Sequence, residues 1–151
     1  MKRREFCLRA VQAASVAGVA NMLQGCGGGS PTSPSGNTPQ LTTINGAVAN
    51  GIVTLPIGAA SPVASVGGAA LVQTSVGVFL VSRTGQNTFS VFTATCTHQE
   101  CTITGFQNST YVCPCHGSQY NTSGVVLSGP APRSLRQFPS QFDSDTLTWS
   151  A

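Results

Sequence analysis

The sequence has few charged residues, and no cluster of one sign outside its first nine positions. Seven Lys or Arg and four Asp or Glu occur in 151 residues, for a formal net charge of +3. Four bases and one acid among residues 1–9 account for that whole excess. Beyond Cys26, three arginines balance three acids: Arg83, Arg133, Arg136, Glu100, Asp143 and Asp145. A neutral body without a basic patch excludes nucleic acid as a partner, because phosphate contacts need clustered Lys and Arg.

The sequence also lacks an apolar run long enough to cross a bilayer. Its mildly apolar stretch, residues 10–23, has 14 positions interrupted by polar side chains, whereas a spanning helix needs about 20 apolar residues. Arg3-Arg4 before this stretch resemble a twin-arginine export signal, and the stretch ends in LQGC, which resembles a lipobox with Cys26 as the lipidated residue. We therefore predict a signal peptide over residues 1–25, with an ordinary amphipathic helix as the alternative.

Charge and large side chains are both missing from residues 27–40, GGGSPTSPSGNTPQ. Such a segment buries too little apolar surface to fold, and its composition is typical of a flexible tether. We assign residues 26–40 to the lipidated cysteine with its tether and residues 41–151 to the folded domain. These features predict a protein of the bacterial cell envelope, exported by the twin-arginine route and held by lipid on the periplasmic side of a membrane.

Helical periodicity is absent beyond residue 30. Short runs rich in β-branched and aromatic residues alternate there with Gly, Asn, Ser and Pro. The clearest runs are residues 51–57, 69–74, 78–83, 89–96, 110–114 and 146–149. This pattern predicts an all-β domain built as an antiparallel sandwich or small barrel.

Histidine is rarer still, and both copies lie in two cysteine-rich segments. CTHQEC spans residues 96–101 and CPCHGS spans residues 113–118, so His98 and His116 share these segments with four of the six cysteines. Two structural disulfides are one explanation in an exported protein, but they leave both histidines without a role. A tetrahedral zinc site is a second explanation, although zinc fingers usually pair Cys with Cys and His with His.

A [2Fe–2S] cluster is the third explanation, and it accounts for a Cys and a His in each segment. Cys96 and Cys113 would bind one iron, while His98 and His116 would bind the other. Two loops would then hold the cluster between them, each supplying one ligand to each iron. We favour this explanation over zinc and over two disulfides.

The two segments resemble the Rieske iron–sulfur proteins, in particular the high-potential branch found in cytochrome bc complexes and in the small subunit of arsenite oxidases. The resemblance implies the Rieske fold, which has three antiparallel sheets and a two-loop cluster-binding subdomain at one end. It implies a Cys101–Cys115 disulfide and hydrogen bonds from Ser118 and Tyr120 that raise the reduction potential. The segment GPAPR, residues 129–133, is similar to the loop that covers the cluster in that family.

One-electron transfer, with no catalytic residue of the chain's own, is the activity that the resemblance implies. In this family the free ring nitrogens of the histidine ligands lose protons on oxidation. We therefore expect His98 and His116 to couple electron transfer to proton transfer, so that the reduction potential falls as pH rises. Members from bc complexes have a leucine after the first histidine, whereas Gln99 and Glu100 stand here. That polar tip favours a membrane-tethered carrier over a subunit docked in an apolar quinol pocket.

The alternative is a Rieske subunit of a quinol–cytochrome c reductase or of an arsenite-oxidase-like complex. Three kinds of redox partner follow from the two possibilities: a c-type cytochrome, cytochrome b with its quinol, or a molybdopterin oxidase subunit.

Overall fold

A computed structural model of the chain describes residues 37–151, which belong to one unit by their internal contacts. The predicted signal peptide, the lipid site Cys26 and most of the tether lie outside the described residues. The described part contains twelve strands and no helix. It accordingly has no helix with the length and apolar character needed to cross a membrane.

The strands form three four-stranded sheets. In the central sheet the order is β1 (Thr42–Asn45), β4 (Ala69–Thr74), β5 (Gly77–Arg83) and β6 (Phe89–Thr93). In the second sheet it is β11 (Ser140–Asp143), β12 (Thr146–Ser150), β3 (Ile52–Pro56) and β2 (Ala47–Ala49). In the third sheet it is β10 (Val126–Ser128), β9 (Gln119–Asn121), β8 (Thr110–Val112) and β7 (Gly105–Gln107). The prediction of an all-β fold with three sheets is confirmed.

One pair of strands departs from the purely antiparallel arrangement that we expected. β1 pairs parallel with β4, with Thr43 opposite Leu71. The chain then passes directly into β2, which pairs antiparallel with β3 in the second sheet. Gly46 lies at this crossing, and a Cβ there would come within 3.0 Å of Val53. Residues 42–49 therefore form one strand in the central sheet and the next strand in the second sheet. The direction of β1 follows from this continuation into the second sheet, because no hairpin joins β1 to β4.

Alternating side chains fill the space between the central and second sheets. Val53 and Leu55 of β3 and Leu147 and Trp149 of β12 are buried, while their neighbours along each strand are more exposed. The Trp149 ring meets Phe79 of β5 edge to face with centroids 5.3 Å apart. This period-two pattern is what a sheet with one buried face requires.

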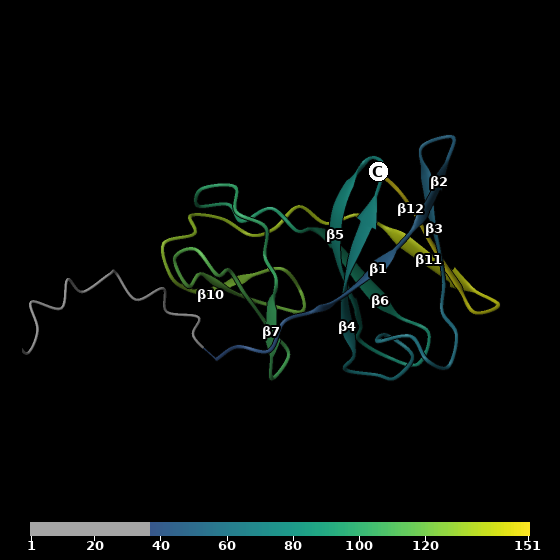
Figure 1. Cartoon of the computed structure of the whole chain (residues 1–151), viewed down its shortest axis with the longest axis horizontal. Coiled ribbons are helices and arrows are strands. Elements are labelled where there is room, and N and C mark those ends of the chain that lie inside the picture. The colour runs from purple at the N-terminus through teal and green to yellow at the C-terminus, as the bar shows by residue number, and fades with distance from the viewer. Residues whose placement is uncertain (1–36) are drawn as a thin grey trace, which may run out of the picture. The chain divides into compact units, whose positions relative to one another are not determined.

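A second core attaches the third sheet to the central one. Leu80 and Phe92 of the central sheet pack with Tyr111 of β8 and Tyr120 of β9, and all four side chains are fully buried. Figure 1 shows β7 and β10 at one end of the domain, β11 and β12 at the other, and β5 and β6 between them. The third sheet, which adjoins the two cysteine–histidine segments, is thus packed against the central sheet through a fully buried core.

Candidate metal centre

The two cysteine–histidine segments form loops with the same backbone pattern. In the first loop, which follows β6, the Cys96 carbonyl accepts a hydrogen bond from the Glu100 amide at 3.0 Å. In the second loop, between β8 and β9, the Cys113 carbonyl accepts one from the Gly117 amide at 3.0 Å. Glu100 and Gly117 both have left-handed backbone angles, with φ of 59° and 72°. Each loop therefore folds back on its first cysteine, and the two cysteines take equivalent places.

Cys96 and Cys113 are both buried and are the free thiols of the described residues. Burial raises the pKa of Cys96, but hydrogen bonds from Tyr120, the His98 amide, Cys113 and Ser118 outweigh burial and lower that pKa below 9.0. Burial and the Cys96 charge raise the pKa of Cys113 above 9.0. The two thiols thus affect each other's pKa, and the surroundings of Cys96 stabilise negative charge on its sulfur.

The two histidines form a second pair beside the thiols. Their ring centroids lie 4.8 Å apart with the rings perpendicular. His116 is exposed and His98 is half-buried, yet the Nδ1 atom of His98 is buried without a hydrogen-bond partner. A buried imidazole nitrogen without a partner costs free energy unless a ligand satisfies it. That atom is therefore a candidate metal donor.

No three His, Cys, Asp or Glu side chains of residues 37–151 converge as they would around one metal ion. The donors instead form a thiol pair and an imidazole pair, which fits a group that needs two sulfurs on one side and two ring nitrogens on the other. Structural zinc usually takes four ligands around a single ion.

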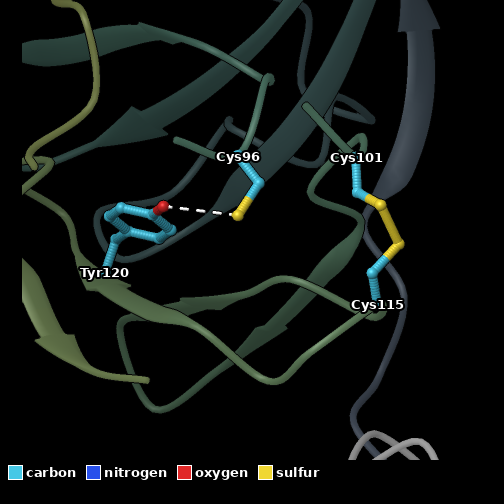
Figure 2. The surroundings of a disulfide bond; sticks show 4 residues. All are labelled: Cys96, Cys101, Cys115 and Tyr120. Carbon is cyan, nitrogen blue, oxygen red and sulfur yellow. Dashed lines mark hydrogen bonds between the residues drawn. A yellow bond between two sulfur atoms is a disulfide. The ribbon is translucent and has the colours of Figure 1, made fainter. Parts of the chain in front are cut away.

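A disulfide joins the two loops at the positions that the resemblance implied. Cys101 and Cys115 are bonded, with their Cα atoms 6.5 Å apart. Figure 2 shows this bond on one side of Cys96 and Tyr120 on the other. The two loops are therefore held together next to the free thiols by a covalent bond that does not use them.

Tyr120 reaches the first loop from β9, and its ring is fully buried. Its hydroxyl lies 3.4 Å from the Cys96 sulfur, the contact drawn in Figure 2. The same oxygen accepts a hydrogen bond from the Thr97 amide at 3.2 Å and lies 3.1 Å from the Thr97 hydroxyl. The Thr97 hydroxyl donates to the Arg133 carbonyl at 2.7 Å, so the Tyr120 proton has two acceptors within reach, the Thr97 oxygen and the Cys96 sulfur. An ionised sulfur is the stronger acceptor of the two.

Ser118 is the other predicted hydrogen-bond donor, and it is also fully buried. Its oxygen accepts a hydrogen bond from the Ala131 amide at 3.2 Å, while its own proton supports negative charge on Cys96. A Cβ on Gly129 would come within 2.6 Å of the Ser118 Cα. Residues 129–133 therefore lie directly against the second loop, as the sequence led us to expect.

Thr97 is a functional neighbour that the sequence did not reveal. It contacts Tyr120 and Arg133, which lie 23 and 36 residues further along the chain. A threonine between a cysteine and a histidine carries no signal by itself, because its role depends on which segments the fold brings to it.

Several known proteins are similar to this chain. The family described as Rieske [2Fe-2S] domain matches residues 55–139. A cytochrome b6-f complex iron-sulfur subunit of Synechococcus sp. is 43% identical over 58 residues, which cover 38% of this chain and 34% of that protein. A ubiquinol-cytochrome c reductase iron-sulfur subunit of Bradyrhizobium diazoefficiens is 41% identical over 66 residues, covering 42% of this chain and 38% of that one. The matched region thus spans little more than a third of these relatives.

A solved structure is similar over more of its length. The cyanobacterial plasma membrane Rieske protein PetC3 from Synechocystis PCC 6803 is 31% identical with a TM-score of 0.50. The match covers 55% of this chain and 86% of that one.

Proposed function

Because the chain belongs to the Rieske [2Fe-2S] domain family, whose cofactor is a [2Fe–2S] cluster, we propose that it is a one-electron carrier tethered to a membrane. The observation that carries this proposal is that two loops joined by a disulfide each supply one buried free thiol and one imidazole, and that the two imidazole rings lie side by side. The chemistry that the cluster supplies when bound is the uptake and release of one electron.

We assign the ligands as the sequence predicted: Cys96 and Cys113 on one iron, His98 and His116 on the other. The burial of both free thiols and the unpartnered Nδ1 of His98 support this assignment. The zinc alternative would give a colourless protein with one bound ion. Iron, acid-labile sulfide and zinc analysis of the purified chain distinguishes the two.

The hydroxyls of Tyr120 and Ser118 are proposed to set a high reduction potential. Both side chains are fully buried, and both stabilise negative charge on the Cys96 sulfur. Reduction adds one negative charge to the centre, so groups that favour negative charge there favour the reduced state.

Proton coupling at the histidines is a further expectation. If Nδ1 of His98 faces the metal, its Nε2 is the nitrogen left to hold or release a proton, and exposed His116 has the same freedom. Reduction then favours the protonated rings, and the potential should fall as pH rises. A potential that stays constant from about pH 6 to about pH 10 would rule this coupling out.

A subunit of an oxidoreductase complex is the second candidate, since the relatives named above are complex subunits. Gln99 and Glu100 are both exposed at the tip of the first loop, and this polar surface favours a carrier with a c-type cytochrome as partner. A cytochrome b with quinol, or a molybdopterin subunit, would be the partner in a complex. Reconstitution distinguishes these cases: a carrier reduces cytochrome c directly, whereas a subunit co-purifies with its complex.

The tether is proposed to be lipidated at Cys26 after export through the Arg3-Arg4 signal to the periplasmic side. Membrane fractionation of the wild type and Cys26→Ser tests the anchor, and Arg3→Lys with Arg4→Lys tests the route. A Cys26→Ser chain that stays fully in the membrane fraction would contradict lipid anchoring.

The central experiment is a redox titration of the full chain followed by electron paramagnetic resonance. We expect the signal of a histidine-ligated cluster with a midpoint toward the upper end of roughly −150 to +300 mV. A silent sample with stoichiometric zinc would overturn the function.

A further inference from the structure

An open cleft of about 700 Å³ lies beside the first ligand loop. Its lining includes His98 and Glu100 from that loop, together with Arg133 and Arg136. The remaining lining is mostly hydroxyl-bearing, with Thr93, Thr95, Thr97 and Ser134. Its volume falls within the range of about 300 to 1,000 Å³ typical of small-ligand pockets. The first ligand loop therefore forms part of a polar cleft.

The segment that carries the two arginines is hydrogen-bonded once to the first loop and once to the end of β6. The Thr97 hydroxyl donates to the Arg133 carbonyl at 2.7 Å, and the Thr93 amide donates to the Arg136 carbonyl at 3.0 Å. The Arg136 guanidinium also lies over the Phe138 ring, 4.7 Å from its centroid. The backbone at Arg133 is thus held by the loop that carries Cys96 and His98, and the backbone at Arg136 by the adjacent end of β6, while both arginines are exposed.

The charges of the domain are distributed unevenly around this cleft. Three arginines occur in residues 37–151, and the third, Arg83, donates to backbone carbonyls of Ala64, Gly85 and Gln86. Arg133 and Arg136 form no ion pair with any carboxylate of the described residues. Glu100 is the one acidic residue that lines the cleft.

We propose that this cleft binds an oxyanion, a carboxylate or phosphate group, held by Arg133, Arg136 and the neighbouring hydroxyls. Guanidinium groups bind such oxygens with charge-assisted hydrogen bonds, and hydroxyls complete their coordination. Glu100 opposes the anion and keeps binding moderate. The lining gives an apolar ring little to pack against, so the chemistry of the ligand is ionic rather than hydrophobic.

Anion binding is linked to electron transfer, and this part rests on the proposed cluster. One electron enters the oxidised centre and adds one negative charge, with no bond formed or broken by the anion. An anion in the cleft therefore binds the oxidised protein more tightly than the reduced one. By reciprocity, the bound anion lowers the midpoint potential. A tenfold preference for the oxidised state lowers it by about 59 mV at saturation.

Binding is measured first, by equilibrium dialysis of radiolabelled inorganic phosphate against the oxidised full chain at constant ionic strength in chloride. We expect one saturable site per chain and a dissociation constant raised at least tenfold in the Arg133→Gln/Arg136→Gln variant. Glu100→Gln should tighten binding. Gln141→Glu, an exposed change on β11 at the opposite end of the domain, lowers net charge by one unit, half the change of the double variant, and serves as the charge control.

The midpoint potential is then measured with phosphate, with acetate and with chloride alone at equal ionic strength. A fall with phosphate identifies a phosphate-type ligand, and a fall with acetate alone identifies a carboxylate. Both effects should disappear in the double arginine variant and persist in Gln141→Glu. Equal potentials in all three salts, or a response unchanged in the arginine variant, would overturn the proposal. Saturable phosphate binding to a chain without a cluster signal would instead refute the electron-carrier function and leave the anion site standing.

Discussion

The two ligand loops share one backbone pattern but are held in place by different means. The second loop joins β8 and β9, which pair directly through Val112 and Gln119, so it is the end of a hairpin. The first loop joins β6 to β7, which lie in different sheets, and a single bridge between Thr95 and Thr102 closes it. The second loop is therefore fixed by its sheet, whereas the first depends on contacts from elsewhere.

The left-handed position of each loop shows the same difference. Gly117 adopts φ of 72° without a side-chain penalty, whereas Glu100 adopts φ of 59° against its intrinsic preference. The first loop accepts this strain because the disulfide and Tyr120 hold it from two sides. Equal loop geometry thus does not mean equal local stability, and the exposed, strained loop is also the one that borders the cleft.

Removal of the disulfide should have the largest effect and should separate the loops most clearly. Closing the segment between Cys101 and Cys115, which are 14 positions apart, contributes about 3 kcal/mol. We expect Cys101→Ser/Cys115→Ser to lose about that much free energy of unfolding. Hydrogen exchange should accelerate more at the Glu100 amide than at the Gly117 amide. The control is the wild-type chain with its Cys101–Cys115 disulfide chemically reduced, which should behave in the same way. Equal acceleration at both amides would show that the loops do not differ.

Exchanging the left-handed residues should give effects of opposite sign. Gly117→Ala places a Cβ in a left-handed conformation and should cost about 1–2 kcal/mol of stability. Glu100→Gly should leave stability equal or improved, because it relieves the same conflict. Glu100→Gln changes the charge but not the backbone preference and is the control. The stability of all three variants is measured by thermal unfolding. A destabilised Glu100→Gly would show that the first loop is not strained.

The two buried tyrosines give a pH-dependent test. Tyr111 is fully buried in β8, and neither its hydroxyl nor that of Ser82 has a hydrogen-bond partner of ordinary geometry. Burial raises the pKa of Tyr111 above 10.0, and the nearby Ser82 hydroxyl offsets only part of that shift. The folded pKa is above the unfolded one, so stability is complete below pH 10.0 and falls above it by about 1.4 kcal/mol per pH unit.

Tyr111→Phe should remove the part of the alkaline loss that comes from this hydroxyl and leave the part from Tyr120, whose pKa is also raised by burial and by Cys96. Denaturant unfolding at a series of pH values would show the smaller slope. The matched control is Phe106→Leu, because the Phe106 ring packs against that of Tyr111 with centroids 4.9 Å apart but carries no titratable group. This control should lower stability by a similar amount at every pH and keep the alkaline slope. A slope that is unchanged in Tyr111→Phe would place its origin in another group.

Removing the Tyr120 hydroxyl should have the smallest effect on stability but a direct effect on the centre. Tyr120→Phe deletes the contact of 3.4 Å with the Cys96 sulfur, a change of about 1 kcal/mol, which for one electron corresponds to about 40 mV. We expect the midpoint potential to fall by about that amount in a redox titration. Tyr111→Phe, which removes a hydroxyl from the other buried tyrosine, should leave the potential unchanged. If Tyr120→Phe has the same midpoint potential as the wild type, the Tyr120 hydroxyl does not raise the potential and the proposed role is wrong.

Much of the fold class could be predicted from local patterns, and the ligand set proposed here also rests on such patterns. The runs at 51–57, 69–74 and 78–83 contain strands at the expected places, because alternation and turn residues act over a few positions. Short strands such as β7 and β10 were missed, since three residues carry too little pattern. The parallel pairing of β1 was also missed, because strand direction depends on which sheet receives the next segment.

The sequence by itself determined the chemistry available to this protein. Two Cys-and-His segments in a charge-poor, strand-rich chain supply two thiols, two imidazoles and a spare cysteine pair, and residue type alone fixes what such groups can bind. The tertiary structure decided which groups act together. The Tyr120 hydroxyl meets Cys96 across 24 positions, Thr97 meets Arg133 across 36, and two unpaired arginines meet His98 at one cleft. Such contacts depend on how three sheets pack, and packing is a property of the whole chain rather than of any local stretch.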